Sequence, residues 1–239
     1  MAINGIFFDL GGTLFSYRNV ARTNIPILIE SVRAMGVVAD ADEIKKAYGV
    51  ATKEVSHRYA EKPYYRHHDM FHEMYLRFYE ILEADYDSDV HRHYHEIQQA
   101  ALFSCLEIKP GCIETLSALK SRGLYLSIVS NIDDDMLEPL IEREQLDRYL
   151  DHWTSSESAQ SCKPDRRFFE VALEKSGLTA NQVLFVGDSP EHDIIGANNA
   201  GMRTVLITEH GLEPPLQTGK KSVDPDHSIQ ALAELIDLV

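Results

Sequence analysis

The chain has 239 residues, of which 44% are hydrophobic and 26% charged, a composition typical of ordinary soluble globular proteins that excludes disordered and fibrous classes. Its formal net charge of −15 argues against a nucleic-acid backbone or an anionic membrane as the main partner, because both favour lysine and arginine. A small anionic substrate is compatible with this charge, since a metal ion or a few basic side chains suffice to bind it locally.

The cysteines are Cys105, Cys112 and Cys162, an odd set with neither metal-site nor disulfide-framework spacing. This usage predicts reduced, buried thiols in a cytosolic setting. The N-terminal apolar run is too short for a signal peptide, and no segment approaches transmembrane length. We therefore expect a cytoplasmic protein, and the sequence makes no prediction about its oligomeric state.

The first element is an apolar run, residues 6–8, that stops at Asp9 and is followed by Gly11 and Gly12. Such a run predicts a strand buried on both faces of a parallel sheet. Asp9 then lies at the carboxyl end of the strand, where open α/β sheets bind their ligands, and the glycines allow a sharp turn or a close approach to a ligand. Taken alone, Asp9 is equally well explained as the cap of the next turn.

The next segment, about ninety residues long, has helical periodicity. Helices are expected over residues 25–35, 44–55, 71–82 and 90–101. Gly36 suits the end of the first helix, and Asp40 or Asp42 can cap the second. A helical insert of this size after a single strand predicts a small separate domain.

From Pro110 onward, helices alternate with strands. Strands are expected over residues 125–129, 153–155, 183–186 and 203–207, and helices over 113–119, 136–141, 168–173, 194–201 and 229–238. Residues 213–225 read as a loop that contains proline and glycine. The alternation predicts an α/β fold with a doubly wound parallel sheet covered by helices on both faces.

Polar side chains follow four of the expected strands: Asp9, Ser130, Lys163 at a helix start, and Asp188. Because the carboxyl ends of parallel strands share one edge of a sheet, these side chains should converge. Asp9 and Asp188, with Asp193 nearby, are hard oxygen ligands of the kind that Mg²⁺ accepts. A lysine and a serine hydroxyl suit phosphate oxygens. Each residue alone could be a cap or a surface group, but together they predict phosphoryl chemistry.

These residues resemble the four motifs of the haloacid dehalogenase-like hydrolase superfamily. The matching segments are Asp9–Leu14, Ser130–Asn131, Lys163–Pro164, and Gly187–Ser189 with residues 193–202. The resemblance extends from residue 3 to about residue 207 in the right order. It implies a Rossmann-like core made of residues 1–15 and 109–239, with a four-helix cap domain over residues 16–108.

For the site, the resemblance implies that Asp9 is the nucleophile and forms an aspartyl-phosphate on a small phosphorylated metabolite. Thr13 would position the loop of the nucleophile. The phosphate would be bound by Gly12, Ser130, Asn131 and Lys163, of which Ser130 and Lys163 also count as catalytic. The cofactor Mg²⁺ would be bound by Asp9, Asp188, Asp193 and the backbone carbonyl of Gly11.

One position departs from the phosphatases of this family, which carry a second Asp where this chain has Gly11. That Asp protonates the leaving oxygen and then activates water, and such a group contributes roughly 10²- to 10⁴-fold in rate. Three hypotheses remain. The protein is a phosphatase whose proton transfers come from the cap, solvent or substrate; or it cleaves another bond; or it binds a phosphometabolite with little turnover.

The second hypothesis covers haloacid dehalogenases and phosphonate-cleaving members, which both lack that Asp. Dehalogenases need no metal and lack the Gly187–Asp188 pair that this chain has. Phosphonate cleavage needs a cap lysine. The lysines in the first part of the cap are Lys45, Lys46 and Lys53, and none lies in a context that matches this role.

Seven of the eleven histidines lie in the insert, where they form a dense group of side chains that titrate near neutrality. His68 and His72 share a helix face with Asp69 beside them. They could bind a metal, supply the missing acid, or simply line a solvated surface. Tyr64–Arg66 is either a substrate-contacting segment or a loop packed on the core.

Overall fold

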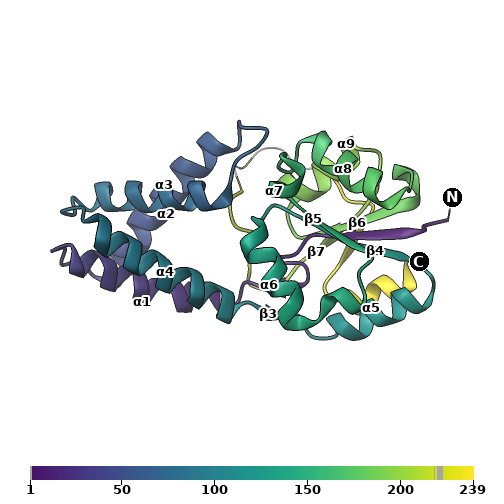
Figure 1. Cartoon of the computed structure of the whole chain (residues 1–239), viewed down its shortest axis with the longest axis horizontal. Coiled ribbons are helices and arrows are strands. Elements are labelled where there is room, and N and C mark those ends of the chain that lie inside the picture. The colour runs from purple at the N-terminus through teal and green to yellow at the C-terminus, as the bar shows by residue number, and fades with distance from the viewer. Residues whose placement is uncertain (1, 218, 220–222) are drawn as a thin grey trace. The chain divides into compact units, whose positions relative to one another are not determined.

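The computed structural model describes residues 2–217, 219 and 223–239, and the chain divides into two compact units. The core unit comprises Met1–Ser16, Pro63–Arg66 and Ile108–Val239, and the helical unit comprises Tyr17–Lys62 and His67–Glu107 (Figure 1). Residues 63–66, which the sequence analysis assigns to the insert, therefore group with the core unit.

The core unit is built on a six-stranded sheet in the order β5-β4-β1-β6-β7-β8, and every neighbouring pair is parallel. The strands are β1 (Gly5–Phe8), β4 (Tyr125–Ser130), β5 (His152–Ser155), β6 (Val183–Gly187), β7 (Arg203–Ile207) and β8 (His227–Ile229). The chain moves outward from β1 to β5 and then returns to the other side of β1 with β6. The order thus reverses between β1 and β6, the position where such folds bind ligands. The predicted doubly wound α/β fold is confirmed.

Helices cover both faces of the sheet, which explains why the central strands are continuous apolar runs. In Figure 1, α7 (Ser156–Ala159), α8 (Arg166–Ser176) and α9 (Ile195–Asn199) lie on one side, and α5 (Cys112–Ser121) and α6 (Asp134–Glu144) on the other. One buried cluster joins the sheet to α8 and α9: Phe7, Val129, Phe168, Phe169, Ala172, Val183, Phe185, Ala197 and Met202.

The register of the central strands decides what lies at the ligand-binding edge. Phe8, the last residue of β1, pairs with Ile128 of β4 and Val186 of β6. Asp9, which follows β1, and Gly187, the last residue of β6, therefore lie beside each other at the carboxyl ends of the two strands. This places the first and last predicted motifs side by side.

The helical unit consists of α1 (Val20–Ala34), α2 (Ala41–Tyr59), α3 (His67–Ile81) and α4 (Ser88–Cys105). Asp40 caps α2 by accepting from the N–H groups of Asp42 and Glu43, each at 2.9 Å, and the Glu43 side chain accepts from the Asp40 N–H in return. Its buried core contains Leu28, Val32, Met35, Ile44, Ala47, Ala51, Tyr75, Phe78 and Tyr79.

Two sequence expectations about secondary structure need correction. Residues 229–238 were expected to be one helix, but Ile229 ends strand β8, and only Leu232–Asp237 is helical, as a 3₁₀ helix. The reason is tertiary, because β8 extends the sheet by pairing Ile229 with Ile207 of β7. The short strands β2 (Phe15–Ser16) and β3 (Glu107–Ile108), which form a separate small sheet, were not predicted.

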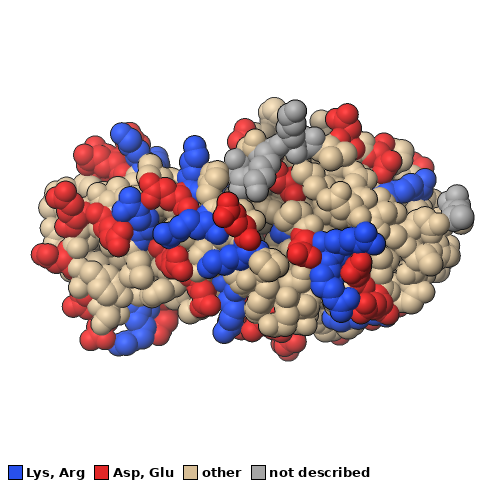
Figure 2. Space-filling model, turned by 90° about the horizontal axis from the view of Figure 1, so that it is seen from above, with Lys and Arg blue, Asp and Glu red and all other residues tan. Residues whose placement is uncertain are grey.

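Within the expected loop over residues 213–225, residues 218 and 220–222 lie outside the described residues. All three cysteines are free thiols; Cys112 and Cys162 are buried, whereas Cys105 is only half-buried. On the face seen in Figure 2, lysine and arginine side chains are interspersed with aspartate and glutamate. Among the described helices, none is long and apolar enough to cross a membrane.

Candidate active site

Asp9 leaves β1 at the centre of the sheet and is buried. Its backbone N–H donates to the carbonyl of Val186 at 2.9 Å, which ties it to β6. The chain then turns back at once, because the N–H groups of Leu14 and Phe15 both donate to the carbonyl of Leu10. The loop after the strand is therefore closed by its own backbone, and the position of Asp9 is fixed from both sides.

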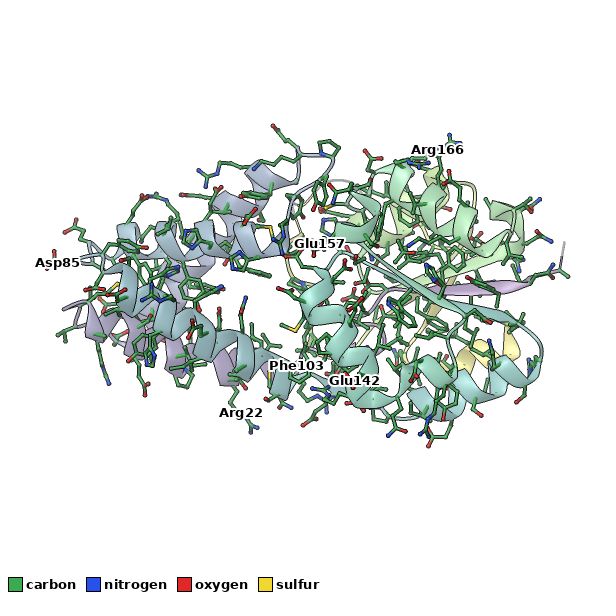
Figure 3. All side chains as sticks on the ribbon, in the orientation of Figure 1. Arg22, Asp85, Phe103, Glu142, Glu157 and Arg166 are labelled. Atoms are coloured by element: carbon green, nitrogen blue, oxygen red, sulfur yellow. The ribbon has the colours of Figure 1, made fainter. Side chains whose placement is uncertain are left out.

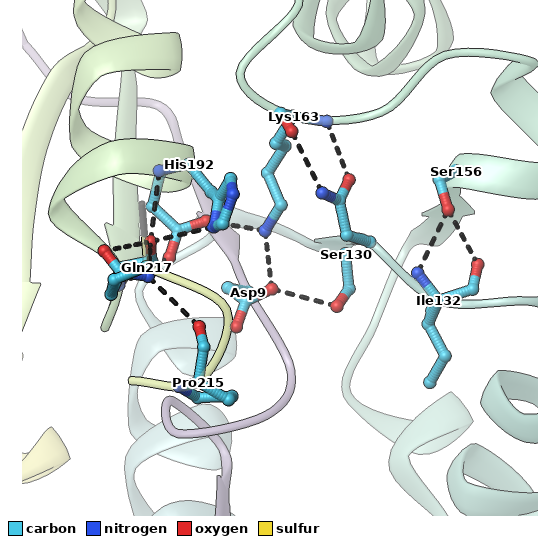
Figure 4. Close-up of polar contacts among 11 residues, drawn as sticks. Asp9, Ser130, Ile132, Ser156, Lys163, His192, Pro215 and Gln217 are labelled. Carbon is cyan, nitrogen blue, oxygen red and sulfur yellow. Dashed lines mark hydrogen bonds and ion pairs between the residues drawn. The ribbon is translucent and has the colours of Figure 1, made fainter. Parts of the chain in front are cut away.

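Lys163 is the buried cation of the site (Figure 4). Its Nζ lies 2.5 Å from Oδ1 of Asp9 and 2.6 Å from Oδ1 of Asp193. The Ser130 hydroxyl donates to the same oxygen of Asp9 at 2.9 Å. The two donors together fix the orientation of the Asp9 carboxylate.

Asp9, Asp188 and Asp193, here called the acidic triad, each offer an oxygen within 4.8 Å of the others. The π-helical turn Pro190–Ile194 brings Asp193 into place, and the Ser189 N–H donates to its Oδ2 at 2.9 Å. When all three are ionised, these carboxylates carry a formal excess of two negative charges over the Lys163 ammonium with which Asp9 and Asp193 are paired. Hard oxygen donors with this excess charge suit a divalent cation such as Mg²⁺.

The titration of the acidic triad reflects this excess negative charge. Burial, together with the charges of Asp9 and Asp193, raises the pKa of Asp188 well above its usual range. Burial also raises the pKa of Asp193 to about 6, although the Lys163 ammonium acts in the opposite direction. Both carboxylates therefore hold protons more tightly than usual when no cation is bound.

Lys163 itself stays charged. Burial lowers its pKa, but the neighbouring carboxylates of Asp193 and Asp9 outweigh that effect, and the net shift is upward. A lysine held as an ammonium is a donor to anionic oxygens and cannot act as a base. The geometry therefore favours a charge-stabilising task for Lys163.

Asn131, predicted to contact the substrate, hydrogen-bonds the backbone of Lys163. Its Nδ2 donates to the carbonyl of Lys163 at 3.0 Å, and its Oδ1 accepts from the Lys163 N–H at 2.7 Å. The Ser156 hydroxyl links to the N–H and carbonyl of Ile132 in the same way (Figure 4). Asn131 thus positions the backbone from which the Lys163 side chain extends.

Gly12, predicted to bind phosphate, uses its N–H to donate to Phe15 and its carbonyl to accept from Lys109. Thr13 is buried, and its hydroxyl has no hydrogen-bond partner in the described part of the chain. Gly11 is half-buried and pairs with Phe15 through an isolated bridge. These three residues therefore form the loop under the acidic triad.

Two residues of this region were missed by the sequence analysis. The Lys109 ammonium, which donates to the Gly12 carbonyl, is buried and lies 3.5 Å from the carboxylate of Glu209. Glu209 also accepts from the Ser16 hydroxyl at 2.9 Å. The sequence position of each residue could have indicated it, since Lys109 directly follows the insert and Glu209 comes shortly after the end of strand β7. Both stabilise the loop that carries Gly12.

The chain matches the family of haloacid dehalogenase-like hydrolases over residues 3–201. It is a member of this family. The (S)-2-haloacid dehalogenase 4A of Burkholderia cepacia is 26% identical over 238 residues, which cover 100% of this chain and 95% of that protein. The ribulose-1,5-bisphosphate 5-phosphatase of Halopiger xanaduensis is 28% identical over 240 residues, which cover 98% of both chains.

Solved structures of the family share the fold of this haloacid dehalogenase-like hydrolase. A crystal structure of YfnB, a Bacillus subtilis protein described as a hydrolase of this family, has a TM-score of 0.75 at 20% identity and covers 100% of this chain and 99% of its own. The relatives thus include both a dehalogenase and a phosphatase. Family membership establishes a hydrolase and leaves its reaction open.

In this hydrolase, residues Tyr64–Arg66 behave as a loop packed on the core. The Cys162 N–H donates to the carbonyl of Pro63 at 2.8 Å, and the Arg66 guanidinium lies 3.5 Å from the carboxylate of Glu157, which is labelled in Figure 3. Gln160 donates to the Tyr64 hydroxyl at 3.2 Å. The segment therefore supports the chain that leads directly into Lys163.

Gly12 of this hydrolase is in van der Waals contact with the acidic triad. Its φ is +75°, and a Cβ added there would lie 1.9 Å from Oδ2 of Asp188. Gly187 is similar, since its added Cβ would lie 2.3 Å from Oδ2 of Asp193. Glycine is therefore required at both positions so that the carboxylates can occupy the space beside the backbone.

We expect the Gly12→Ala substitution to lower Mg²⁺ affinity and turnover by roughly tenfold or more, because the new methyl group must displace the Asp188 carboxylate. Calorimetric Mg²⁺ titration and steady-state rates measure this. Gly123→Ala is the matched control, since Gly123 has φ +79° and no atom of the described residues lies within 4 Å of an added Cβ. Both variants should lose about 1 kcal/mol of stability from backbone strain, and an equal loss of Mg²⁺ affinity in both would contradict the argument.

Proposed function

We propose that the protein is a Mg²⁺-dependent phosphatase that acts on a small phosphorylated metabolite through an aspartyl-phosphate on Asp9. The observation that carries the proposal is the acidic triad, in which Asp9 and Asp193 are buried and paired with the ammonium of Lys163, so that the carboxylates outnumber their paired cation. A site of this charge is costly unless a cation binds there. A dehalogenation reaction needs no bound cation, so it would not explain the excess negative charge of the site.

The residues present fit Mg²⁺. Asp9, Asp188 and Asp193 would hold the ion through carboxylate oxygens, and the family resemblance adds the carbonyl of Gly11. When bound, Mg²⁺ would neutralise the acidic triad and stabilise negative charge on the phosphoryl oxygens. Lys163 and Ser130, which already donate to the Asp9 carboxylate, would then donate to the oxygens of the transferred phosphoryl group.

The reaction would have two steps. A carboxylate oxygen of Asp9 attacks phosphorus and forms a P–O bond, while the bond from phosphorus to the substrate oxygen breaks and that oxygen takes a proton. Water then attacks the same phosphorus, the bond to Asp9 breaks, and phosphate leaves with Asp9 restored. Lys163 stabilises the charge on the phosphoryl oxygens in both steps.

Gly11 limits both proton transfers, because no carboxyl group at this position is available to serve as acid and base. Good leaving groups need little protonation, so they should be favoured. The test measures phosphate release from an aryl phosphate and a panel of sugar phosphates, with Mg²⁺ and with a chelator. We expect Mg²⁺-dependent multiple turnover, fastest on the aryl phosphate. Absence of Mg²⁺-dependent release across the panel would exclude the proposal.

Dehalogenation is the second candidate, because a curated relative is an (S)-2-haloacid dehalogenase and Gly11 suits a reaction that needs no leaving-group acid. In that reaction an Asp9 oxygen would attack carbon and displace halide. Halide release from a 2-chloro acid in the presence of a chelator would support this candidate. Tight binding of phosphometabolites without turnover would instead support the binding-protein hypothesis.

We expect Gly11→Asp to raise turnover of alkyl phosphates by roughly 10²- to 10⁴-fold and to change the aryl phosphate rate little, because it supplies an acid and base where leaving groups need one. The backbone at Gly11 is not in the left-handed region, unlike that at Gly12, so a side chain there adds no backbone strain. Gly11→Asn is the control of equal size. Equal rates for the Asn and Asp variants would contradict the role assigned to this position.

The Mg²⁺ affinity should fall as the pH drops below about 6, since burial raises the pKa of Asp193 to about 6 and that of Asp188 as well. A raised carboxylate pKa means that the metal-free folded state binds extra protons at acid pH, and Mg²⁺ must displace them. The apparent Kd should rise about tenfold per pH unit for each proton displaced.

Thermal shifts in a Mg²⁺ titration at pH 5.5 and 7.5 measure this dependence, with sodium chloride at matched ionic strength as the control. The stabilisation by Mg²⁺ should be larger at pH 7.5. Equal apparent affinities at the two pH values would show that these carboxylates do not bind the ion.

A further inference from the structure

Lys109 is a second buried lysine of the core unit, and the proposed reaction does not use it. The residue is 8% exposed, and its ammonium donates to the carbonyl of Gly12. Its backbone N–H donates to the carbonyl of Leu14 at 2.8 Å. The loop that follows Asp9 is therefore bonded to Lys109 at two points, although 97 positions separate Lys109 from Gly12 in the chain.

Gly12 connects Lys109 to the acidic triad. The Gly12 N–H donates to the carbonyl of Phe15 at 2.7 Å and its carbonyl accepts from Lys109, so the peptide groups on both sides of its Cα are held. An added Cβ at Gly12 would lie 1.9 Å from Oδ2 of Asp188. The backbone of Gly12 thus forms one wall of the space that the Asp188 carboxylate occupies, and a shift of this wall changes where the carboxylate can lie.

Glu209 holds the Lys109 ammonium and offsets its charge. Oε2 of Glu209 lies 3.5 Å from Nζ of Lys109, and Oε1 accepts from the Ser16 hydroxyl at 2.9 Å. The Lys109 and Glu209 side chains are only 9% and 17% exposed, so solvent screens the pair poorly. A lone ammonium here would repel a cation in the acidic triad, and the carboxylate of Glu209 counteracts that repulsion.

We propose that Lys109 is a positioning residue of the metal site, which holds the Gly12 backbone against Asp188 and is itself held by Glu209. The inference rests on the proposed function, because it concerns the Mg²⁺ that the acidic triad would bind. Residues that orient metal ligands from outside the coordination sphere typically contribute roughly 10- to 100-fold in metal affinity or activity. All the residues involved belong to the core unit.

A purely electrostatic role for Lys109 makes the opposite prediction. If only its charge mattered, Lys109→Met would remove a repelling cation, and Mg²⁺ would bind more tightly. If the bond to Gly12 matters, the same substitution releases the Gly12 carbonyl and should weaken Mg²⁺ binding by roughly tenfold or more. The sign of the change in affinity therefore separates the two roles.

Calorimetric Mg²⁺ titration of the full chain at pH 7.5 measures this affinity, and turnover of an aryl phosphate is followed in parallel. Lys109→Met should raise the apparent Kd for Mg²⁺ by about tenfold or more. It should raise the Mg²⁺ concentration for half-maximal turnover by the same factor. The double variant, Lys109→Met with Glu209→Gln, restores the charge balance without the bond to Gly12, so it should bind Mg²⁺ at least as weakly as Lys109→Met.

Lys120→Met is the matched control, since Lys120 also pairs with a carboxylate, that of Asp151 at 2.6 Å. Its Kd should stay within about twofold of the parent value. Urea unfolding without Mg²⁺ accompanies each titration. Lower stability of Lys109→Met with an unchanged Kd would show a merely structural role and overturn the inference. Tighter Mg²⁺ binding by Lys109→Met, or binding like the parent by the double variant, would also overturn it.

Ser16→Ala provides the test if Lys109→Met does not fold. It changes no charge but removes the hydrogen bond that holds Glu209, so Kd should rise by about threefold, and an unchanged Kd would overturn the inference. The parent protein separates this inference from the proposed function. If the parent binds no Mg²⁺, the proposed function fails and this inference fails with it. If the parent binds Mg²⁺ and the variants bind it equally well, only this inference fails.

Discussion

Replacing Asp9 with Asn is expected to lower turnover by roughly 10⁴-fold or more while the fold remains intact. The amide keeps the shape of the carboxylate and the hydrogen bond from Ser130. It removes the nucleophilic oxygen and one of the three negative charges of the acidic triad. Steady-state rates with an aryl phosphate measure the loss, and acid-quenched mixtures should contain covalent phosphate only in the parent protein.

Asp151→Asn is the matched control. Asp151 lies at the opposite edge of the sheet, where its carboxylate accepts from the Leu126 N–H at 2.9 Å and pairs with Lys120 at 2.6 Å. We expect its activity to stay within about twofold of the parent, because surface pairs contribute little. Retention of Mg²⁺-dependent turnover in the Asp9 variant would exclude this residue as the nucleophile.

Replacing Lys163 with Met is expected to reduce the free energy of unfolding by roughly 3 to 5 kcal/mol in the absence of Mg²⁺. The side chain is buried, and its ammonium is the ion-pair partner of both Asp9 and Asp193. Without it, the carboxylates must either protonate or repel one another in a buried site. Urea unfolding measures the loss, and turnover should fall with it.

Mg²⁺ should restore part of the stability lost in the Lys163 variant, because a cation among the carboxylates replaces the missing positive charge. Lys175→Met is the control, since Lys175 is exposed and donates a hydrogen bond to Thr154 at 3.2 Å. The free energy of unfolding of the Lys175→Met variant should fall by only about 1 kcal/mol. Similar losses in the two lysine variants would show that charge compensation is not what Lys163 provides.

The sequence predicted the parts of the fold that depend on local pattern. Continuous apolar runs identified the central strands, and the polar residues that follow them identified Asp9, Ser130 and Asp188 as neighbours. Strand β8 was missed because its three residues gain their structure from pairing with β7. The sequence pattern of so short a segment does not indicate that it pairs with another strand.

The charged groups of the site could be predicted from the sequence, but the residues that hold these groups in place could not. The family resemblance implied a substrate contact for Asn131, but it could not show that the amide of this residue hydrogen-bonds the backbone of Lys163, a contact between residues 32 positions apart. The pairing of His72 with His91 was equally out of reach, since it depends on how α3 and α4 face each other. Hydrogen bonds between segments that are distant in the sequence can be identified only once the fold is known.

The bonds that hold Asp9 in place have a consequence for folding. Its carboxylate is bonded to Ser130 and Lys163, which are 121 and 154 positions away in the chain. These contacts exist only after β1 has been inserted between β4 and β6. A chain still leaving the ribosome cannot assemble this chemistry until its C-terminal half has emerged, so premature activity in a nascent chain is prevented by topology alone.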